Sequence, residues 1–287
     1  MTIIFSLTTL FLLVPLIKKV MAKYMKNIHL SKESNPILSI ITVNYNSGDG
    51  LVKTVDSISE FLGQLNIQLI LVDGLSSDGS LLRLGSSIDL FSVVISEKDR
   101  GIYDAMNKGV KHATGDWVWF LNSGDVALES SKLITRYLVS EREKYNFLYC
   151  NFSTDLGRVV EQNLTLKELF RGMINHQTIF YKRELLDYFD PSYGLGADFA
   201  HLLRHYKDIN HKKINIPVVQ YDLNGKSSSF NRVTRAKAWY QRFRAFKNSS
   251  LRLDYKIFGM FLSMGICIFK YFFPKFSSRT MRLISYK

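Results

Sequence analysis

The stretch Leu38-Ser-Ile-Ile-Thr-Val-Asn44, closed by Tyr45-Asn-Ser-Gly48, decides the fold of this chain. Its apolar and β-branched residues predict a short buried strand, and the polar residues that follow predict a turn. The same unit recurs at Gln68-Leu-Ile-Leu-Val72, which ends in the turn Asp73-Gly-Leu-Ser-Ser-Asp-Gly79. Between the two strands, apolar residues at helical spacing predict a helix with one buried face, formed by Leu51, Val55, Ile58 and Leu62.

Further apolar runs continue this alternation at residues 92–96, 117–121 and 147–149. Strands that alternate with helices are typical of an α/β fold whose mostly parallel sheet is covered on both faces. Ligands of such sheets bind at the carboxyl ends of the strands. In this sequence those ends carry polar residues, namely Asn44-Tyr-Asn46, Asp73, Glu97-Lys-Asp99 and Asn122-Ser-Gly-Asp125.

Each of these polar residues, taken singly, is an ordinary turn former or helix cap. Several carboxylates gathered at one edge of a sheet would repel each other unless a cation or a ligand lay among them. A hard divalent ion that keeps positions open for phosphate oxygens is a common solution. The pattern as a whole therefore favours a ligand site at this edge.

The composition is that of a globular protein. Of the 287 residues, 46% are hydrophobic and 22% are charged, which excludes a disordered or collagen-like chain. The length fits one large domain with appendages, or two small domains. The two cysteines, Cys150 and Cys267, are too few and too far apart for a disulfide framework or a zinc cluster, so we expect a reducing compartment.

The net charge of +13 lies entirely at one end of the chain. Residues 226–287 contain 14 basic residues and a single acid, Asp254, so residues 1–225 carry 24 charges of each sign. A nucleic-acid-binding protein would be expected to distribute its basic residues over the recognition fold. Segregation of the charge therefore favours an attachment segment and makes nucleic acid an unexpected partner.

Within this tail, apolar residues recur at helical spacing and basic residues flank them. The apolar residues are Ala236, Trp239, Tyr240, Phe243 and Phe246, and the basic ones are Arg235, Lys237, Arg242 and Arg244. Such a pattern is typical of a helix that lies in the headgroup layer of an anionic membrane. The uncharged run 257–269 would rise about 20 Å as a helix, too little to cross roughly 30 Å of hydrocarbon. We expect it to enter one leaflet; the alternative is a helix pair that packs on the body with a solvated basic face.

The first 17 residues are uncharged and mostly apolar, and lysines follow them. Basic residues ahead of the apolar run and a small-residue cleavage site, which a signal peptide would need, are both missing. The segment could instead be a short signal anchor, or translation could begin at Met21 or Met25. Each reading keeps the body of the protein on the cytoplasmic side.

Several segments together resemble the family 2 glycosyltransferases of bacterial polysaccharide assembly. They are residues 38–46, the Asp73 turn, Ser96-Glu-Lys-Asp-Arg-Gly-Ile-Tyr-Asp-Ala-Met-Asn-Lys-Gly109, Gly115-Asp-Trp-Val-Trp-Phe-Leu-Asn-Ser-Gly-Asp125 and His176-Gln177. The resemblance covers residues 36–228, and its most specific block is 96–125. It implies a GT-A fold, an α/β/α sandwich, and an inverting enzyme that depends on a nucleotide sugar.

Transfer of a sugar from such a donor breaks a bond to a diphosphate leaving group, whose growing charge calls for a metal or a basic clamp. By resemblance, the metal-binding motif falls on Asn122-Ser-Gly-Asp125. Family members often have Asp at the positions that hold Asn122 and Gly124 here. Asp125 is therefore the predicted metal ligand, for Mn²⁺ or Mg²⁺, and Asn122 a neutral contact to ribose or metal.

The resemblance also assigns the donor pocket. Asp73 would accept a hydrogen bond from the nucleotide base, and the segment with Thr42, Asn44 and Asn46 would line the base pocket. Asn107 would face the site, and His176 would lie beside the donor or the acceptor. Asn224-Gly-Lys-Ser-Ser-Ser229 resembles the family's late loop that closes over the nucleotide.

The segment after residue 98 allows two interpretations. Asp99-Arg-Gly101 opens a helix with an apolar face, and Arg100 at a helix N-terminus is a candidate contact for diphosphate or ribose. Asp99 and Arg100 could equally serve as caps. Asp104 and Lys108 are spaced as a surface ion pair.

An inverting displacement needs a base that accepts the proton of the acceptor hydroxyl. By resemblance, this carboxylate follows a glycine-rich approach at the start of a helix, which Gly194-Leu-Gly-Ala-Asp198 matches. Family members often carry an acid immediately before it, where this chain has Ala197. Asp198 is the predicted catalytic base, although the same position suits a helix cap.

The sequence thus predicts three parts: an apolar segment 1–35, a GT-A domain 36–229 and a membrane-associating tail 230–287. The predicted function is hexosyl or N-acetylhexosaminyl transfer to a saccharide acceptor, expected to be lipid-linked, at the cytoplasmic face of the membrane. Two alternatives remain open: a nucleotidyltransferase of the same fold and a non-catalytic, membrane-bound protein that binds a sugar nucleotide.

Overall fold

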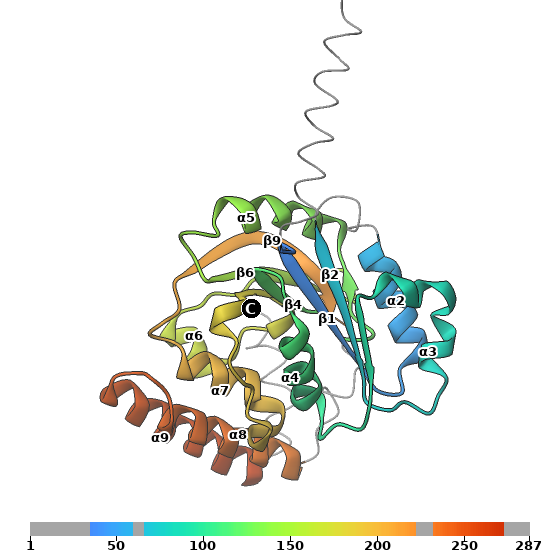
Figure 1. The fold of residues 1–287 in the computed structure, drawn as a ribbon. Coiled ribbons are helices and arrows are strands. Elements are labelled where there is room, and N and C mark those ends of the chain that lie inside the picture. Colours follow the sequence, from blue (N-terminus) through green and yellow to red (C-terminus); the bar gives the residue numbers. More distant parts are fainter. Residues whose placement is uncertain (1–34, 60–65, 222–231, 273–287) are drawn as a thin grey trace, which may run out of the picture.

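A single nine-stranded sheet forms the centre of the protein in the computed structural model, which describes residues 35–59, 66–221 and 232–272 (Figure 1). The strand order is β3-β2-β1-β4-β8-β6-β9-β5, and β7 pairs with β6 outside this path. Helices cover both faces of the sheet, so the predicted α/β/α sandwich is confirmed.

The sheet has a parallel half and a half in which parallel and antiparallel pairs are mixed. Strands β3, β2, β1 and β4 run parallel to one another, and β8 is antiparallel to β4 and β6. Strand β9 is parallel to β6 and antiparallel to β5. Their bounds are β1 Leu38–Asn44, β2 Ile67–Asp73, β3 Val93–Ser96, β4 Trp117–Phe120, β5 Val126–Ala127, β6 Phe147–Thr154, β7 Val159–Val160, β8 Ile179–Lys182 and β9 His211–Tyr221.

The helices form two layers and a C-terminal pair. Their bounds are α2 Gly48–Ser59, α3 Ser80–Arg83, α4 Ile102–His112, α5 Ile134–Ser140, α6 Leu166–Arg171, α7 Ala197–Arg204, α8 Arg232–Lys247 and α9 Leu253–Phe272. Short 3₁₀ turns are η1 Gly85–Leu90, η2 Glu129–Leu133, η3 His176–Thr178, η4 Arg183–Leu185 and η5 Pro191–Gly196.

Alternation of side chains along the central strands creates the two cores. Ile40 of β1 and Leu71 of β2 pack with α2, α3 and α5 on one face. Ile41 and Val72, their neighbours in sequence, pack with α4, α6 and α7 on the other face. Because both faces are covered, β1 is buried at every position, which is why its sequence reads as a continuous apolar run.

The parallel register brings the polar strand ends together. Asn44 at the end of β1 lies opposite Asp73 at the end of β2, and Ile41 of β1 lies opposite Phe120 at the end of β4. The amide of Ser123, in the turn after β4, donates to the carbonyl of Val43. The predicted strands at 38–44, 68–72, 92–96 and 117–121 therefore end at one edge of the sheet, as the α/β pattern requires.

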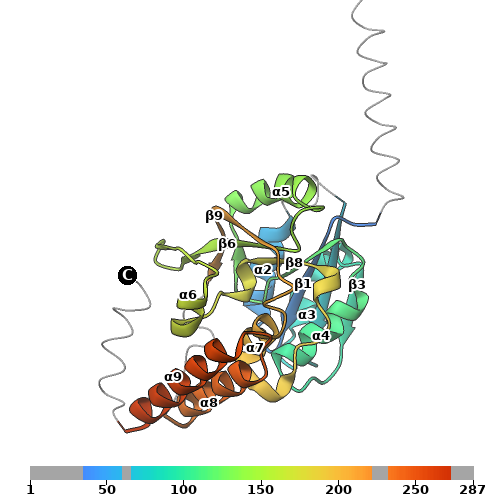
Figure 2. The same ribbon diagram turned by 90° about the vertical axis from the view of Figure 1, so that its left-hand side faces the viewer.

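The C-terminal helices α8 and α9 lie side by side and pack on the body through α7 and η5 (Figure 2). Gly259 of α9 faces Phe246 of α8 so closely that a Cβ atom at this position would overlap the phenyl ring. The predicted helices at 236–246 and 257–269 are thus present, and they form a hairpin attached to the α7 side of the molecule.

The sequence pattern predicted that Arg242 of α8 flanks an apolar stripe that faces outward. In the structure Arg242 instead packs on the body. Its guanidinium lies 4.0 Å from the ring centre of Phe199 in α7 and donates to the carbonyl oxygens of Leu169 and Gly172. Phe246 of the same helix is fully buried. In α8, therefore, the structure supports the alternative of a helix that packs on the body.

No helix in the described ranges 35–59, 66–221 and 232–272 has both the length and the apolar character needed to cross a membrane. The predicted N-terminal segment up to residue 34, Leu62 and the loop 224–229 lie outside those ranges.

Candidate active site

Asp73 organises the part of the site at the ends of β1 and β2. Its Oδ1 accepts hydrogen bonds from Asn44 Nδ2 at 2.8 Å and from the Ser76 hydroxyl at 2.5 Å. Its Oδ2 accepts from the Ser76 amide at 2.9 Å and from the Ser96 hydroxyl at 3.0 Å. This carboxylate therefore joins the turns after three neighbouring strands before any ligand binds.

The hydrogen bonds also determine the charge of Asp73. Complete burial alone would raise the pKa of Asp73, but the donors from Ser76, Asn44 and Ser96 favour the ionised form and outweigh it. The result is a pKa of Asp73 below the usual value. Asp73 is thus a buried carboxylate that stays charged.

Asn46 and Thr42 occupy different positions along this strand end. Asn46 is exposed, has a positive φ of 49°, and accepts the amide of Ser77 at 2.8 Å. It therefore fastens the β1 turn to the β2 turn. Thr42 is fully buried two residues before Asn44, on the same side of the strand.

The predicted metal motif forms a tight turn against the first turns of α2. Gly124 has a φ of 105°, a conformation that side chains rarely adopt, and its amide donates to the carbonyl of Gly50 and to the hydroxyl of Thr54. The Thr54 hydroxyl in turn donates to the carbonyl of Asp125 at 2.7 Å. Asp125 itself is 6% exposed.

Unpartnered polar atoms gather at this same edge. Within the described part of the chain, seven buried side-chain nitrogen or oxygen atoms have no hydrogen-bond partner. Four of them are oxygens of β1 or of the turn after β4: Thr42 Oγ1, Asn44 Oδ1, Asn122 Oδ1 and Ser123 Oγ. Since buried polar atoms without partners are costly, their concentration indicates a site that a polar ligand completes.

These atoms fit the group that the family resemblance implies. Oxygen ligands from a carboxylate and an amide suit Mg²⁺ or Mn²⁺, which are commonly held by one or two carboxylates together with substrate phosphates. Asp125 and Asn122 lie in one turn, and the Asn122 oxygen has no hydrogen-bond partner among the described residues. The donor set present at this turn therefore suits a divalent cation that binds together with a diphosphate.

A chain of three side chains connects this turn to the opposite side of the site. Asn122 Nδ2 lies 3.2 Å from His176 Nε2, and His176 Nδ1 lies 3.1 Å from Asp198 Oδ2. Asp198 stands in the first turn of α7, and its other oxygen accepts the amide of Phe199 at 2.7 Å. His176 thus connects the predicted base to the predicted metal motif.

Tyr103 of α4 packs against His176, the middle residue of this series of three side chains. The residue is 5% exposed, and its ring centre lies 6.2 Å from that of His176. Burial raises the pKa of the Tyr103 phenol well above the usual value, and the charge of Asp198 raises it further. The phenol therefore stays protonated and can donate a hydrogen bond.

The segment before α4 differs from its predicted pairing. Asp104 pairs with Arg100 at 3.1 Å instead of Lys108, while Lys108 pairs with Glu97 at 2.9 Å. Asp99 accepts the amide of Gly101 at 2.8 Å, and an added Cβ on Gly74 would overlap its carboxylate. Asp99 therefore caps the turn and also lies beside the Asp73 turn.

Asn107, which the resemblance places facing the site, uses both ends of its amide within the protein. Its Nδ2 donates to the carbonyl of Phe189 at 2.7 Å, and its Oδ1 accepts the amide of Phe189 at 2.9 Å. With both ends of the amide occupied, Asn107 fastens α4 to the loop that leads to α7.

Sequence reasoning missed three residues that build the site: Thr54, Ser76 and Tyr103. Thr54 lies on the apolar face of α2, where a hydroxyl looks like a tolerated core residue. Ser76 belongs to the spacing Asp73-x-x-Ser76, which is a common turn signal that could have suggested its role. Gln177, quoted only with His176, accepts the amide of Asn122 at 3.3 Å.

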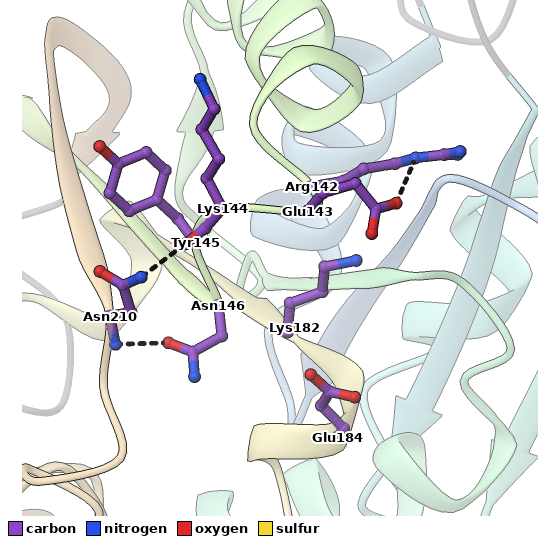
Figure 3. A pocket seen from close by; sticks show the side chains of 8 residues that line it. All are labelled: Arg142, Glu143, Lys144, Tyr145, Asn146, Lys182, Glu184 and Asn210. Carbon is purple, nitrogen blue, oxygen red and sulfur yellow. Dashed lines mark hydrogen bonds and ion pairs between the residues drawn. The ribbon is translucent and has the colours of Figure 1, made fainter.

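A polar pocket also opens at the opposite edge of the sheet (Figure 3). Asn146 precedes β6, and Lys182, whose ammonium group lies 5.1 Å from the Trp117 ring centre, ends β8 at the start of β4. None of the predicted site residues lines it; the lining residues are Arg142, Glu143, Lys144, Tyr145, Asn146, Lys182, Glu184 and Asn210.

Comparison with known proteins identifies the family. A family model described as "Glycosyl transferase family 2" matches residues 39–178. An uncharacterized glycosyltransferase of Mycobacterium tuberculosis is 31% identical over 208 residues, which cover 68% of this chain and 78% of the relative. The chain belongs to glycosyltransferase family 2. The matched segment contains the Asp73 turn, the Asn122–Asp125 turn and His176.

A second relative of this glycosyltransferase has a more informative name. The Escherichia coli enzyme UDP-Glc:alpha-D-GlcNAc-diphosphoundecaprenol beta-1,3-glucosyltransferase WfgD is 25% identical over 240 residues, covering 80% of this chain and 94% of the relative. Together with the family match, it supports a sugar-transferring role in polysaccharide biosynthesis.

Solved structures confirm the GT-A fold of this glycosyltransferase. Staphylococcus aureus TarS, crystallised with UDP-GlcNAc, superimposes with a TM-score of 0.61 at 17% identity, covering 78% of this chain and 70% of TarS. The mannosyltransferase PcManGT of Pyrobaculum calidifontis, in complex with GDP-Man and Mn²⁺, gives 0.56 at 13% identity, covering 89% and 82%.

Proposed function

We propose that this glycosyltransferase moves a hexosyl or N-acetylhexosaminyl group, with inversion, from a nucleoside diphosphate sugar to a hydroxyl of a saccharide acceptor. The observation that carries the proposal is the series Asp198–His176–Asn122, because it connects a carboxylate in α7 to the turn that holds Asp125. A base on one side of a site and a diphosphate-binding turn on the other are the two parts that a single displacement needs.

The donor occupies the ends of β1, β2 and β4 in this proposal. The unpartnered oxygens of Thr42, Asn44, Asn122 and Ser123 receive its polar groups. Asp73, whose oxygens already accept four hydrogen bonds, holds the turns that shape the base pocket, and exposed Asn46 lies at the rim of that pocket. Asp99 and Arg100 flank this pocket, and Arg100, being exposed, can leave Asp104 for a diphosphate oxygen.

Asp125 holds a divalent cation in this proposal, Mn²⁺ or Mg²⁺, with Asn122 as its neutral neighbour. When bound, the cation supplies positive charge to the departing diphosphate. The Mn²⁺ found with PcManGT supports this assignment, because that enzyme shares the fold.

Asp198 acts as the base. The carboxylate accepts the proton of the acceptor hydroxyl as the oxygen attacks the anomeric carbon, and the bond from that carbon to the diphosphate breaks on the opposite side. His176 holds one oxygen of Asp198 and the Phe199 amide holds the other, so the carboxylate is oriented before the acceptor arrives.

We further propose a lipid-linked acceptor at the cytoplasmic face of the membrane, and helix α9 supports this part. Its apolar residues Leu253, Ile257, Phe261, Met264 and Ile268 follow one another at helical spacing, and all are exposed, Phe261 to 76%. We call these five residues the α9 stripe. The side of α9 that carries Gly259 and buried Ser263 faces inward, where Gly259 meets α8.

The charge of the C-terminal part of the sequence supports an anionic lipid surface as the partner of the stripe. Residues 226–287 carry 14 basic residues and one acid, so an anionic lipid surface complements both the charge and the apolar stripe. The name of the E. coli relative, which specifies a diphosphoundecaprenol-linked acceptor, agrees with a membrane-bound substrate.

Incubation with sugar nucleotides labelled in the sugar and, separately, in the nucleotide tests the proposed reaction. Transfer of the sugar label to a saccharide acceptor, with release of nucleoside diphosphate and an inverted anomeric centre, is expected. Transfer of the nucleotide label would instead indicate a nucleotidyltransferase. Binding of the donor without any transfer, with several acceptors, would indicate a non-catalytic protein.

A further inference from the structure

A second cluster of ionisable side chains lies at the far end of α7 from Asp198. His205 follows the last turn of this helix, His201 lies one turn before it, and Asp187 approaches from the preceding loop. The Nε2 atoms of both histidines are 3.2 Å from Asp187 Oδ1. One ligand atom from each of the three residues lies within 4.8 Å of the other two.

His201 is the unusual member of this cluster. The residue is 2% exposed, and its Nε2 faces Asp187 Oδ1 at 3.2 Å but makes no well-aligned hydrogen bond within the described part of the chain. A buried imidazole nitrogen without a well-formed hydrogen bond is costly in a folded protein, and a cation between this nitrogen and the carboxylate would satisfy both atoms.

We propose that Asp187, His201 and His205 form a binding site for Zn²⁺. Two imidazole nitrogens and one carboxylate oxygen, with a fourth position open to water, are a typical ligand set for this ion. Ligands about 2.0–2.1 Å from a tetrahedral zinc lie about 3.3 Å apart, and the two Nε2–Oδ1 distances of 3.2 Å approach that value. Counting cysteines in the sequence could not reveal such a site.

The surroundings of the cluster are compatible with a cation. His205 Nδ1 faces the Asp208 carboxylate at 3.8 Å, and a shift of a few tenths of an ångström would give it the outer carboxylate that commonly orients a zinc-bound histidine. Arg204 contacts Asp187 Oδ1 at 2.7 Å, donates to the carbonyl of Tyr188, and donates through its Nε to His205 Nε2 at 3.3 Å. Two carboxylates and one guanidinium leave a net negative charge around the cluster. Binding of the cation requires Arg204, whose side chain is 39% exposed, to release Asp187 and His205 and to keep its contact with Tyr188.

The site is separate from the proposed catalytic cation. Asp125 and Asn122 offer oxygen ligands at the end of β4, whereas this cluster offers nitrogen ligands at the other end of α7. Zinc at this position would fasten the 187–189 loop, which Asn107 also holds through Phe189, to the helix that carries Asp198. We therefore assign the ion a structural role.

Cobalt titration of the full chain tests the proposal. The protein is first freed of metal with EDTA, and Co²⁺ is then added in the presence of excess Mn²⁺, which occupies an all-oxygen site. We expect one equivalent of Co²⁺ to produce the strong visible absorption of four-coordinate cobalt, and Zn²⁺ to abolish it. Absence of this absorption would overturn the proposal.

Variants locate the site. His205→Gln and Asp187→Asn should each weaken Co²⁺ binding at least about tenfold. His211→Gln, at an exposed histidine of β9, and Asp125→Ala should leave the absorption unchanged. Survival of the absorption in His205→Gln, or its loss in Asp125→Ala, would contradict the assignment.

A folding control keeps the test decisive. The circular dichroism spectrum of each variant is recorded without metal, and His205→Gln, whose side chain is partly exposed, should retain the wild-type spectrum. Zn²⁺ should raise the Tm of the wild-type protein and leave that of His205→Gln unchanged. Equal shifts in both proteins would exclude this cluster as the zinc site.

Discussion

His176 Nδ1 lies 3.1 Å from Asp198 Oδ2, although 22 residues separate the two in sequence. His176 belongs to the 3₁₀ turn before β8 and Asp198 to the first turn of α7, so the contact joins two elements on different sides of the site. The imidazole also meets Asn122, and it therefore aligns the carboxylate with the turn that contains Asp125.

Replacement of Asp198 tests the base directly. Asp198→Asn keeps the size of the side chain and removes its basicity, so kcat should fall about 10²- to 10⁴-fold. Affinity for the donor, measured by calorimetry in the absence of acceptor, should stay within about twofold of wild type, because the proposal assigns Asp198 to the acceptor and not to the donor. Near-normal turnover in this variant would remove Asp198 from the base role.

His176 is a positioning residue in the same proposal. His176→Ala removes a hydrogen bond to a charged group, worth about 1.5–3 kcal/mol, so kcat should fall about 10- to 100-fold. KM for the donor should change little, because in the proposal His176 orients the base and does not bind the donor. His112→Ala, at an exposed histidine at the end of α4, is the control. If KM for the donor rises and kcat stays unchanged, His176 binds the donor instead.

Asp73 makes the stability of the protein depend on pH. Its pKa is lowered in the folded state, so it stabilises the fold above the unfolded pKa of about 3.9, and this contribution is lost as the pH falls through the folded value. Asp73→Asn should therefore lower the free energy of unfolding at pH 7 by about 2 kcal/mol and flatten its decline below about pH 4.

Urea unfolding at several pH values measures this effect. Asp89→Asn, at an exposed aspartate, serves as the matched control. Parallel pH curves for wild type and Asp73→Asn would show that the buried carboxylate is not the origin of the acid sensitivity.

The α9 stripe predicts binding to anionic vesicles. Burial of a phenylalanine is worth about 1.5–3 kcal/mol, so Phe261→Glu should weaken co-sedimentation with phosphatidylglycerol vesicles at least about tenfold. Leu82→Glu, at an exposed leucine of α3, introduces the same charge outside the stripe and should have little effect. If Phe261→Glu instead dissociates a dimer and leaves vesicle binding intact, the stripe binds a second copy of the chain.

Much of the fold could be predicted from local patterns. The run 38–44 forms β1 at the predicted residues, and Leu51, Val55 and Ile58 are the buried face of α2, because β-branched runs and helical spacing report burial directly. The parallel order of the first strands then follows, and with it the edge where Asn44 and Asp73 meet.

The contacts of single side chains could not be predicted in this way. Arg242 reads as a surface cation, yet carbonyl groups and the Phe199 ring enclose it. Asn107 lies within a family motif, yet it binds the backbone of Phe189, 82 residues away. Such partners come from distant parts of the chain, and only the tertiary arrangement brings them together.

The close fit of Gly259 against Phe246 has a geometric consequence. Phe246 also contacts Phe199, the residue next to Asp198, so α9, α8 and α7 are packed into one unit. The distance from the outer side of α9 to the Asp198 carboxylate is therefore fixed. If α9 rests on a surface, this distance sets how far an acceptor hydroxyl must extend from that surface in order to react.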